Sequence, residues 1–204
     1  MMAGSHVALG AAAWVVGAPM LGLSPVSPLG LGLSVLGSLL PDIDHPKSWI
    51  GKRARPVSDV LAMSLGHRGV THSLVALVGC AWLLLDQGWS REIVAPLAVG
   101  YMSHLAADLL TPGGLRLAWP FRGTWSLPLC RTGSPFEPLV VAILLCFAGW
   151  GSLSNPEMGA AWKSAGLCRA WDEGVPACRP PPAPRRAPPA RLASPLRAAN
   201  GAAL

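Results

Sequence analysis

The sequence is short of charge. Only 13% of its 204 residues are Asp, Glu, Lys or Arg, about half the share of an average soluble domain. Hydrophobic residues make up 51%, which excludes a wholly disordered chain, because disorder requires low hydrophobicity and high charge. An ordinary soluble enzyme is disfavoured, since so few charged side chains cannot cover its surface. The composition therefore predicts an integral membrane protein.

Cysteine motifs and an N-terminal basic cluster are also missing. The five cysteines include no C-x-x-C pair, so neither a disulfide framework nor a Cys-rich zinc site is indicated. Cys80 and Cys146 lie inside apolar runs, and we interpret them as small buried hydrophobic residues. No Lys or Arg precedes the first apolar run, which argues against a cleaved signal peptide.

What the chain does contain is a series of apolar runs. A helix needs roughly 20 apolar residues to cross a hydrocarbon core of about 30 Å. The candidates are residues 6–23, 28–40, 70–85, 93–110 and 139–153. The run 28–40 is too short to span alone and is rich in glycine. We therefore predict an all-α, polytopic membrane protein with about four to five membrane helices.

The distribution of basic residues predicts the orientation of these helices. Loops 41–69 and 111–138 together contain eight Lys and Arg, whereas loops 24–27 and 86–92 contain only Arg91. The positive-inside rule places the basic loops in the cytoplasm. This predicts a multi-pass protein of the cytoplasmic membrane.

The composition changes after residue 154. Residues 155–204 contain seven Lys and Arg against three Asp and Glu, with proline runs at 180–182 and 188–189. Such a stretch cannot bury a core. We predict a membrane-embedded domain at 1–154 and a disordered tail at 155–204. Nucleic-acid binding through the arginines between residues 179 and 197 is an alternative that we do not favour. No aromatic side chains lie between these arginines, and five crossings place the tail outside the cytoplasm.

Histidine is scarce, and its placement is informative. All five histidines fall at the predicted cytoplasmic ends of the apolar runs, together with four carboxylates. The residues are His6, His45, His67, His72 and His104, with Asp42, Asp44, Asp108 and Glu137. His104 and Asp108 are four apart, a spacing that puts both on one helix face.

These side chains are suitable ligands for a divalent metal. Neutral imidazole and carboxylate bind zinc and also manganese or iron. A carboxylate outside the ligand set could act as general base on a metal-activated water, and Asp44 and Glu137 are candidates. Arg68 lies among these residues in the sequence; it could bind an anionic phosphate, or only help to set the topology.

Simpler interpretations stay open for each residue. A lone histidine at a helix end is usually an interfacial polar group, and a His-x-x-x-Asp pair can be a structural hydrogen bond. The same residues could also line the path of a metal or proton transporter, which we keep as the alternative function. A transporter should place polar groups near the midplane and towards both faces, whereas here they gather at one face. Ionisable groups in membrane segments are costly, which favours a functional role for the set.

Several motifs, in this order, resemble a known family. They are Ser5-His6, Leu40-Pro41-Asp42-Ile43-Asp44-His45, His67-Arg68-Gly69-Val70-Thr71-His72-Ser73, the run Gly100–Asp108 with Thr111 and Gly114, and Gly133-Ser134-Pro135-Phe136-Glu137. Over about residues 3–153 the chain resembles the bacterial inner-membrane, metal-dependent hydrolases of the YdjM/YbcI type, described as LexA-regulated. Pro-Asp-x-Asp followed by His-Arg-Gly-x-Thr-His is the more specific part of the match.

The resemblance implies a membrane-bound hydrolase with a polar site. Position by position, that site comprises His6, Asp42, Asp44, His67, His72, His104, Asp108 and Glu137. Our hypothesis from sequence is a divalent metal, zinc first, held by His67, His72, His104 and Asp108, with Asp42 and His6 as further ligands. The expected partners are membrane lipids and a small or lipid-linked phosphoester substrate. The oligomeric state, the substrate and the metal are left open by the sequence.

Overall fold

A computed structural model describes residues 1–65, 69–121, 123–154, 158–159 and 163. The predicted ligand His67 and the predicted substrate contact Arg68 lie outside the described residues. So does nearly all of the predicted tail 155–204.

Within the described ranges the chain is helical, and its only β feature is an isolated antiparallel bridge between Leu115 and Trp125. The all-α prediction is thus confirmed. The elements are α1 (Ala3–Gly17), η1 (Pro19–Leu21), α2 (Pro28–Gly37), η2 (Leu40–Asp44), α3 (Arg55–Leu65), η3 (Val70–His72), α4 (Leu74–Asp86), α5 (Arg91–Leu109) and α6 (Phe136–Ser154). The elements labelled η are single 3₁₀ turns.

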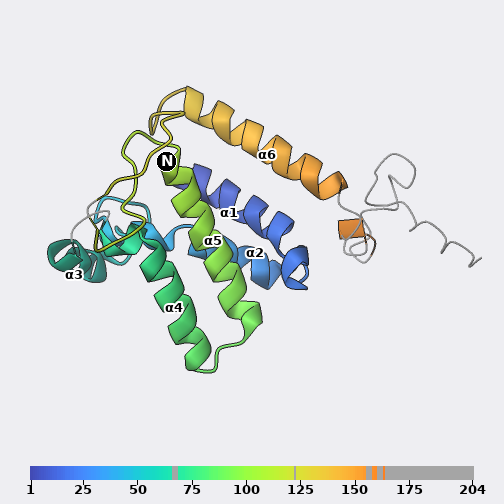
Figure 1. The fold of residues 1–204 in the computed structure, drawn as a ribbon, viewed down its shortest axis with the longest axis horizontal. Helices are drawn as coiled ribbons and strands as arrows, with labels where there is room; N and C mark the ends of the chain where they lie inside the picture. Colours follow the sequence, from blue (N-terminus) through green and yellow to red (C-terminus); the bar gives the residue numbers. More distant parts are fainter. Residues whose placement is uncertain (66–68, 122, 155–157, 160–162, 164–204) are drawn as a thin grey trace, which may run out of the picture.

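Helix α5 lies at the centre of the bundle. It packs against α1, α2 and α4, while α6 lies along α1 (Figure 1). Local sequence signals set the helix starts. Ser27 caps α2 by accepting a hydrogen bond from the Gly30 amide, with Pro28 in the first turn. The Ser73 side chain caps α4 in the same way, and this cap fixes the chain directly after His72.

Small residues bring three helices into backbone contact. A side chain added at Gly100 of α5 would place its Cβ 1.9 Å from the Ser34 carbonyl oxygen of α2. One added at Gly37 would lie 2.2 Å from the Leu97 carbonyl oxygen. The Ser34 hydroxyl also donates to the carbonyl of Gly10 in α1 at 2.9 Å. Small residues at helix interfaces are typical of packing inside membranes.

The number of membrane crossings is not confirmed. Among the described helices only α6, with 19 residues, is long and apolar enough to span a bilayer. Helices α1 and α4 are apolar but have 15 and 13 residues, about 20 Å or slightly more at 1.5 Å per residue. Helix α5 has 19 residues but carries Glu92, His104 and Asp108. Four to five crossings remain a prediction.

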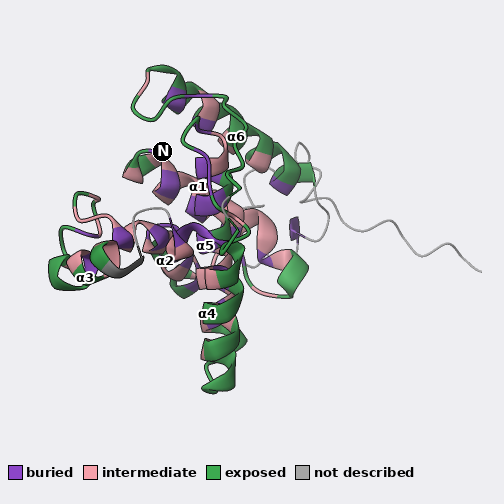
Figure 2. Cartoon of the chain, turned by 60° about the vertical axis from the view of Figure 1, so that its left-hand side comes forward, coloured by how far each residue is buried: buried purple, intermediate pink, exposed green. Residues whose placement is uncertain are grey.

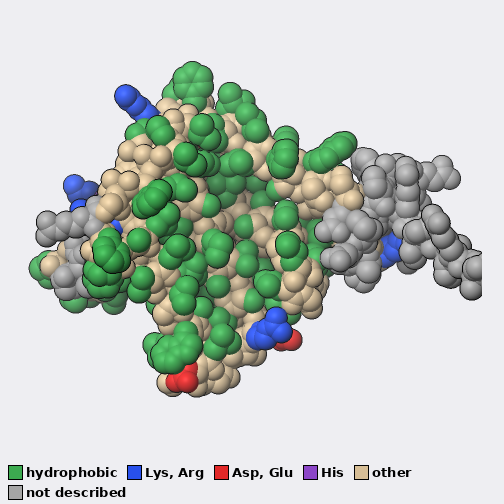
Figure 3. Space-filling model, in the orientation of Figure 1, with side chains coloured by type: hydrophobic (Ala, Val, Ile, Leu, Met, Phe, Trp, Pro, Cys, Tyr) green, Lys and Arg blue, Asp and Glu red, His purple; other side chains and the backbone are tan. Residues whose placement is uncertain are grey.

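The outward faces of α4 and α6 are apolar. Trp82 on α4 is 65% exposed, and Phe147 and Trp150 on α6 are similarly uncovered. Figure 2 shows both helices largely exposed, and Figure 3 shows hydrophobic side chains covering the face in view. Large exposed apolar patches mark surfaces that meet a membrane or a partner. Our interpretation of Cys80 and Cys146 as buried is wrong, because both lie on these exposed faces.

The connections sort into two ends of the bundle. The N-terminus of the described chain, the segment 38–54 and the segment 110–135 lie towards one end, and the α4–α5 connection lies at the opposite end (Figure 1). A backbone hydrogen bond from the Leu74 amide to the Leu117 carbonyl ties the start of α4 to the segment 110–135. The end that gathers these connections also holds the polar site.

Candidate metal centre

Four chain elements converge on one buried polar cluster. His6 comes from the first turns of α1, Asp42 from η2, His72 from η3, and His104 and Asp108 from the last turns of α5. His6, His72, His104 and Asp108 are almost completely buried. The Asp42 side chain keeps 24% of its surface exposed, so the cluster touches solvent mainly there.

Four donor atoms in this cluster face one another. The Nε2 atoms of His72 and His104 are 3.4 Å apart. Asp42 Oδ1 lies 3.7 Å from the first and 3.9 Å from the second. Asp108 Oδ2 lies 3.9 Å and 3.7 Å from the same two atoms. Ligand atoms around a tetrahedral zinc ion, with bonds of 2.0–2.2 Å, stand about 3.3–3.6 Å apart. Five of the six separations among these donors are therefore close to the spacing of a metal site.

The two oxygens of Asp108 face different groups. Oδ2 points towards the two histidine nitrogens described above. Oδ1 lies 3.4 Å from His6 Nε2 and 2.5 Å from the amine of Met1. The His6 ring also stacks on His104, with ring centroids 3.8 Å apart. Neither ring nitrogen of His6 has a hydrogen-bond partner within the described structure, although both are buried. A buried group without a hydrogen bond needs an explanation, such as a bound water or ion, and His6 Nε2 stands beside the Asp108 carboxylate.

The outer nitrogens of both histidines are held by the protein. Nδ1 of His104 donates to the carbonyl of Ser38 at 2.7 Å. The Thr71 hydroxyl donates to Asp44, so its oxygen is free to accept from Nδ1 of His72 at 3.1 Å. In the neutral form of each imidazole the proton therefore sits on Nδ1, and Nε2 presents its lone pair to the cluster. Metal-binding histidines are commonly oriented in this way.

Charge around His72 alters its protonation and that of Asp42. Burial disfavours the imidazolium, but the nearby carboxylates of Asp42 and Asp44 outweigh it and raise the pKa of His72 to about 9. Burial also acts against ionisation of Asp42, yet His72, His104 and His6 outweigh it and hold its pKa below the usual range. The cluster without a metal thus holds a proton on His72 at neutral pH.

Glu137 has a different environment. Its Oε1 accepts from the Met2 amide and the Ser5 hydroxyl, and its Oε2 accepts from the Gly133 amide, all at 2.6 Å. This carboxylate ties the start of α6 to the start of α1. It belongs to neither of the groups of side chains that could hold an ion.

The structure thus brings together five of the predicted metal ligands. They form two overlapping groups, His6 with His104 and Asp108, and Asp42 with His72 and His104. Asp44 lies on the opposite side of the His72 ring from the cluster, with its Oδ2 3.6 Å from His72 Nδ1. His45 belongs to neither group.

Sequence reasoning missed three groups that orient the cluster. These are the Ser38 carbonyl, the Thr71 hydroxyl, and Tyr101, whose hydroxyl donates to the Thr71 carbonyl. Thr71 stands directly beside His72, so its position was a usable signal. The Ser38 carbonyl carries no signal in the sequence, because every residue has one.

Comparison with known proteins settles the family. The model of the YdjM inner membrane protein family matches residues 1–171, which include every member of the cluster. The chain belongs to this family. Inner membrane protein YdjM of Escherichia coli is 39% identical over 139 residues, covering 64% of this chain and 71% of that protein. The protein of that name from Shigella flexneri matches equally well.

A further relative comes from a different bacterium. The uncharacterized protein YvsG of Bacillus subtilis is 34% identical over 139 residues, covering 68% of this chain and 86% of its own length. No solved structure matches the chain significantly. The resemblance to the YdjM family inferred from the motifs is therefore confirmed, while the relatives' names specify no reaction.

Proposed function

We propose that this YdjM-family protein is a metal-dependent hydrolase of the bacterial inner membrane, acting on a phosphoester, lipid or lipid-linked, at the cytoplasmic interface. The observation that carries the proposal is the set of five separations of 3.4–3.9 Å among Asp42, His72, His104 and Asp108. The names of its relatives and the apolar faces of α4 and α6 support the membrane location. The basic loops support the cytoplasmic orientation.

The donor chemistry fits one divalent ion of the zinc type. Two imidazoles and two carboxylates are suitable ligands for zinc. His104 offers only Nε2, because its Nδ1 donates to Ser38, so the two overlapping groups share one ion and do not hold two. His6 stands beside Asp108 as a further donor. An ion there would act as a Lewis acid that activates water and polarises a phosphoryl oxygen.

The protein's own groups divide the remaining work. Asp42 is the partly exposed carboxylate of the cluster, so its second oxygen can accept a proton from a water that enters from solvent. Asp44 is fully buried behind His72 and accepts from Thr71. Glu137 already accepts three hydrogen bonds. We therefore assign proton transfer to Asp42, and positioning to Asp44 and Glu137, in place of the catalytic roles expected from sequence.

Several observations support a hydrolase over the alternative transporter. The described site lies at one end of the bundle, and at the opposite end the apolar helices α1 and α4 carry no histidine. A transport path requires polar groups near the middle and towards both faces. Metal flux into proteoliposomes that is lost in His104→Ala would contradict the hydrolase proposal.

The test is elemental analysis of the purified full-length chain. We expect about one metal per wild-type chain and less than a tenth of that in His72→Ala and Asp108→Ala, because each loses a donor atom. His45→Ala is the matched control, a histidine on the neighbouring segment outside both groups, and should keep its metal. Hydrolysis of bis-p-nitrophenyl phosphate should follow the metal content. Full metal content in both ligand variants would refute the assignment.

A further inference from the structure

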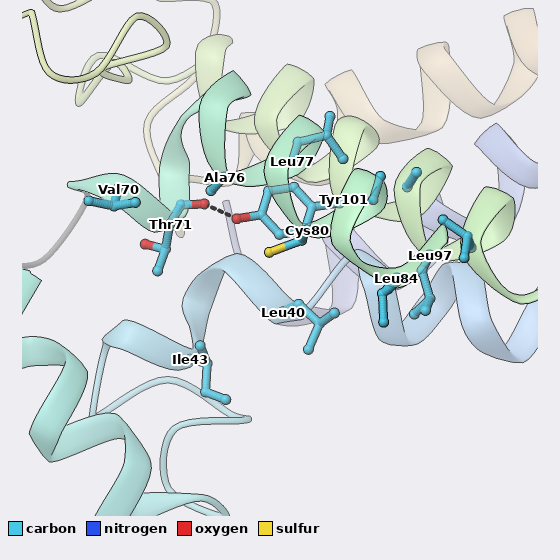
Figure 4. Close-up of a pocket in the computed structure, with 13 residues that line it drawn as sticks. Leu40, Ile43, Val70, Thr71, Ala76, Leu77, Cys80, Leu84, Leu97 and Tyr101 are labelled. Atoms are coloured by element: carbon cyan, nitrogen blue, oxygen red, sulfur yellow. Dashed lines mark hydrogen bonds between the residues drawn. The ribbon is translucent and has the colours of Figure 1, made fainter. Parts of the chain in front are cut away.

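A cavity of about 320 Å³ lies between α4 and α5, next to the polar cluster (Figure 4). Its walls are largely aliphatic. Leu77, Cys80 and Leu84 contribute from one face of α4, and Leu97 and Ala98 contribute from α5. The volume is within the range of sites for small molecules, about 300–1,000 Å³.

One end of this cavity is lined by direct chain neighbours of residues in the candidate metal centre. Thr71 lines the cavity and precedes the ligand His72 in the chain. Ile43 lines it from η2, where it stands between Asp42 and Asp44. Figure 4 places Val70, Thr71 and Ile43 towards one end, and Leu84 and Leu97 towards the other. The cavity therefore runs from the segments that carry Asp42 and His72 along the two helices.

The polar atoms of the lining are satisfied within the protein. The Tyr101 hydroxyl donates to the Thr71 carbonyl, and the Thr71 hydroxyl donates to Asp44. An apolar cavity without free polar groups does not hold ordered water well. Its occupant should accordingly be a hydrocarbon.

The cavity also reaches the apolar outer surface. Cys80, which lines the cavity, is itself exposed at the outside of α4. A hydrocarbon chain can thus enter from the side without crossing water.

We propose that the α4–α5 cavity binds one hydrocarbon chain of a membrane lipid and so places the lipid's polar head at the cluster of Asp42, His72, His104 and Asp108. This rests on the proposed function and narrows its substrate class to phosphoesters that carry a long alkyl or isoprenoid chain.

The test uses the full-length protein in phosphatidylethanolamine nanodiscs with phosphatidic acid that carries a diazirine in one chain. After irradiation, mass spectrometry maps the labelled residues. We expect labels at Leu84 and Leu97 that saturate and are displaced by unlabelled phosphatidic acid. Labels at the exposed Phe147 of α6 should rise in proportion to the lipid and should not be displaced, because they report ordinary contact with the bilayer.

Two variants separate the cavity from the outer surface. Ala81→Trp fills the cavity and should abolish the displaceable labels, whereas Val78→Trp, on the outward side of the same helix, should leave them unchanged. Ala98→Leu is a smaller filling variant in case Ala81→Trp does not fold. The metal content of all three should equal that of the wild type, since none carries a ligand atom.

The outcomes distinguish this proposal from the proposed function. Displaceable labels that survive Ala81→Trp and Ala98→Leu, or their absence from wild type, would overturn the cavity as a chain site even if the protein binds metal. Cross-links between two copies through the cavity would also overturn it. Displaceable, variant-sensitive labels in a protein that holds no metal would support the chain site and refute the hydrolase.

Discussion

His72 contacts acidic groups on both sides of its ring. Nε2 lies 3.7 Å from Asp42, within the cluster, while Nδ1 lies 3.6 Å from the fully buried Asp44 and 3.1 Å from Thr71. A carboxylate behind a metal-binding imidazole fixes the ring and raises its basicity. The residue therefore depends on Asp44 for its orientation, although Asp44 donates nothing to an ion.

Replacing Asp44 should weaken metal binding without abolishing it. We expect Asp44→Asn to lower zinc affinity by about 10–100-fold, the usual loss for a group that orients a ligand. Competition with a chromophoric chelator measures this. Asp59→Asn is the matched control, because Asp59 is an exposed carboxylate on α3 that pairs with Arg55. A loss of metal as complete as in His72→Ala would instead make Asp44 a ligand.

Metal affinity should rise with pH. His72 holds its proton up to a pKa of about 9 in the metal-free cluster, so an ion must displace that proton at neutral pH. Asp42, whose pKa is held low, is already ionised and adds no dependence. We expect the affinity to increase about tenfold per unit between pH 7 and pH 8. Titration calorimetry in buffers of different ionisation enthalpy should show that one proton is released for each metal bound. A metal affinity that does not change with pH would contradict the displacement of the His72 proton.

At this scale the sequence predicted membership of the cluster better than the role of each member. The four-residue spacing of His104 and Asp108 predicted that both lie on one helix face. In the structure His104 Nε2 and Asp108 Oδ2 are 3.7 Å apart. The roles of Asp44 and Glu137 depended on which neighbours donate to them. Thr71 and Gly133 do so through turns whose geometry a residue pattern does not specify.

Among the helices, the α2–α5 contact holds the site together. The end of α2 delivers the Ser38 carbonyl to His104, and Gly37 and Gly100 allow the two backbones to approach that closely. From sequence, the glycine-rich run 28–40 was recognised as too short to span. Its ten-residue helix instead serves as a packing partner of α5. The glycine content of the run 28–40 indicated that α2 would not span the membrane alone. It did not indicate that α2 packs against α5.

A methyl group at this contact should disturb both the fold and the cluster. Gly100→Ala puts a Cβ against the Ser34 carbonyl, and overpacking of this kind typically costs about 1–3 kcal/mol. We expect a lower unfolding temperature in detergent and weaker metal binding. Gly79→Ala is the matched helical control, since nothing lies within 4 Å of the added atom. Equal unfolding temperatures for the two variants would contradict a tight α2–α5 contact.

On the scale of the whole molecule, the site and the basic connections share one end of the bundle. The positive-inside pattern predicted this arrangement from the loops alone. The positions of Lys and Arg in the loops do not depend on the exact length of each helix. The count of crossings did not follow from the sequence in the same way. Apolar runs in 6–23 and 70–85 include residues that fold into turns, so α1 and α4 are shorter than the runs.

Orientation can be measured by cysteine accessibility in spheroplasts. We expect an impermeant maleimide to label Gln87→Cys, in the α4–α5 connection, and not Lys52→Cys or Thr124→Cys. All three should react after permeabilisation, and the unsubstituted protein gives the background from native cysteines. Labelling of residue 52 in intact spheroplasts would place the site outside the cytoplasm.

The order of the ligands along the chain has a consequence for biogenesis. The donors come from η2, η3 and the end of α5, so the set is incomplete until Asp108 has left the ribosome and α5 has packed beside α2. Metal loading is therefore a late event, which follows insertion and helix assembly. A nascent chain stalled before residue 104 should capture no ion, and loading of the finished protein would report that its helices have reached their native arrangement.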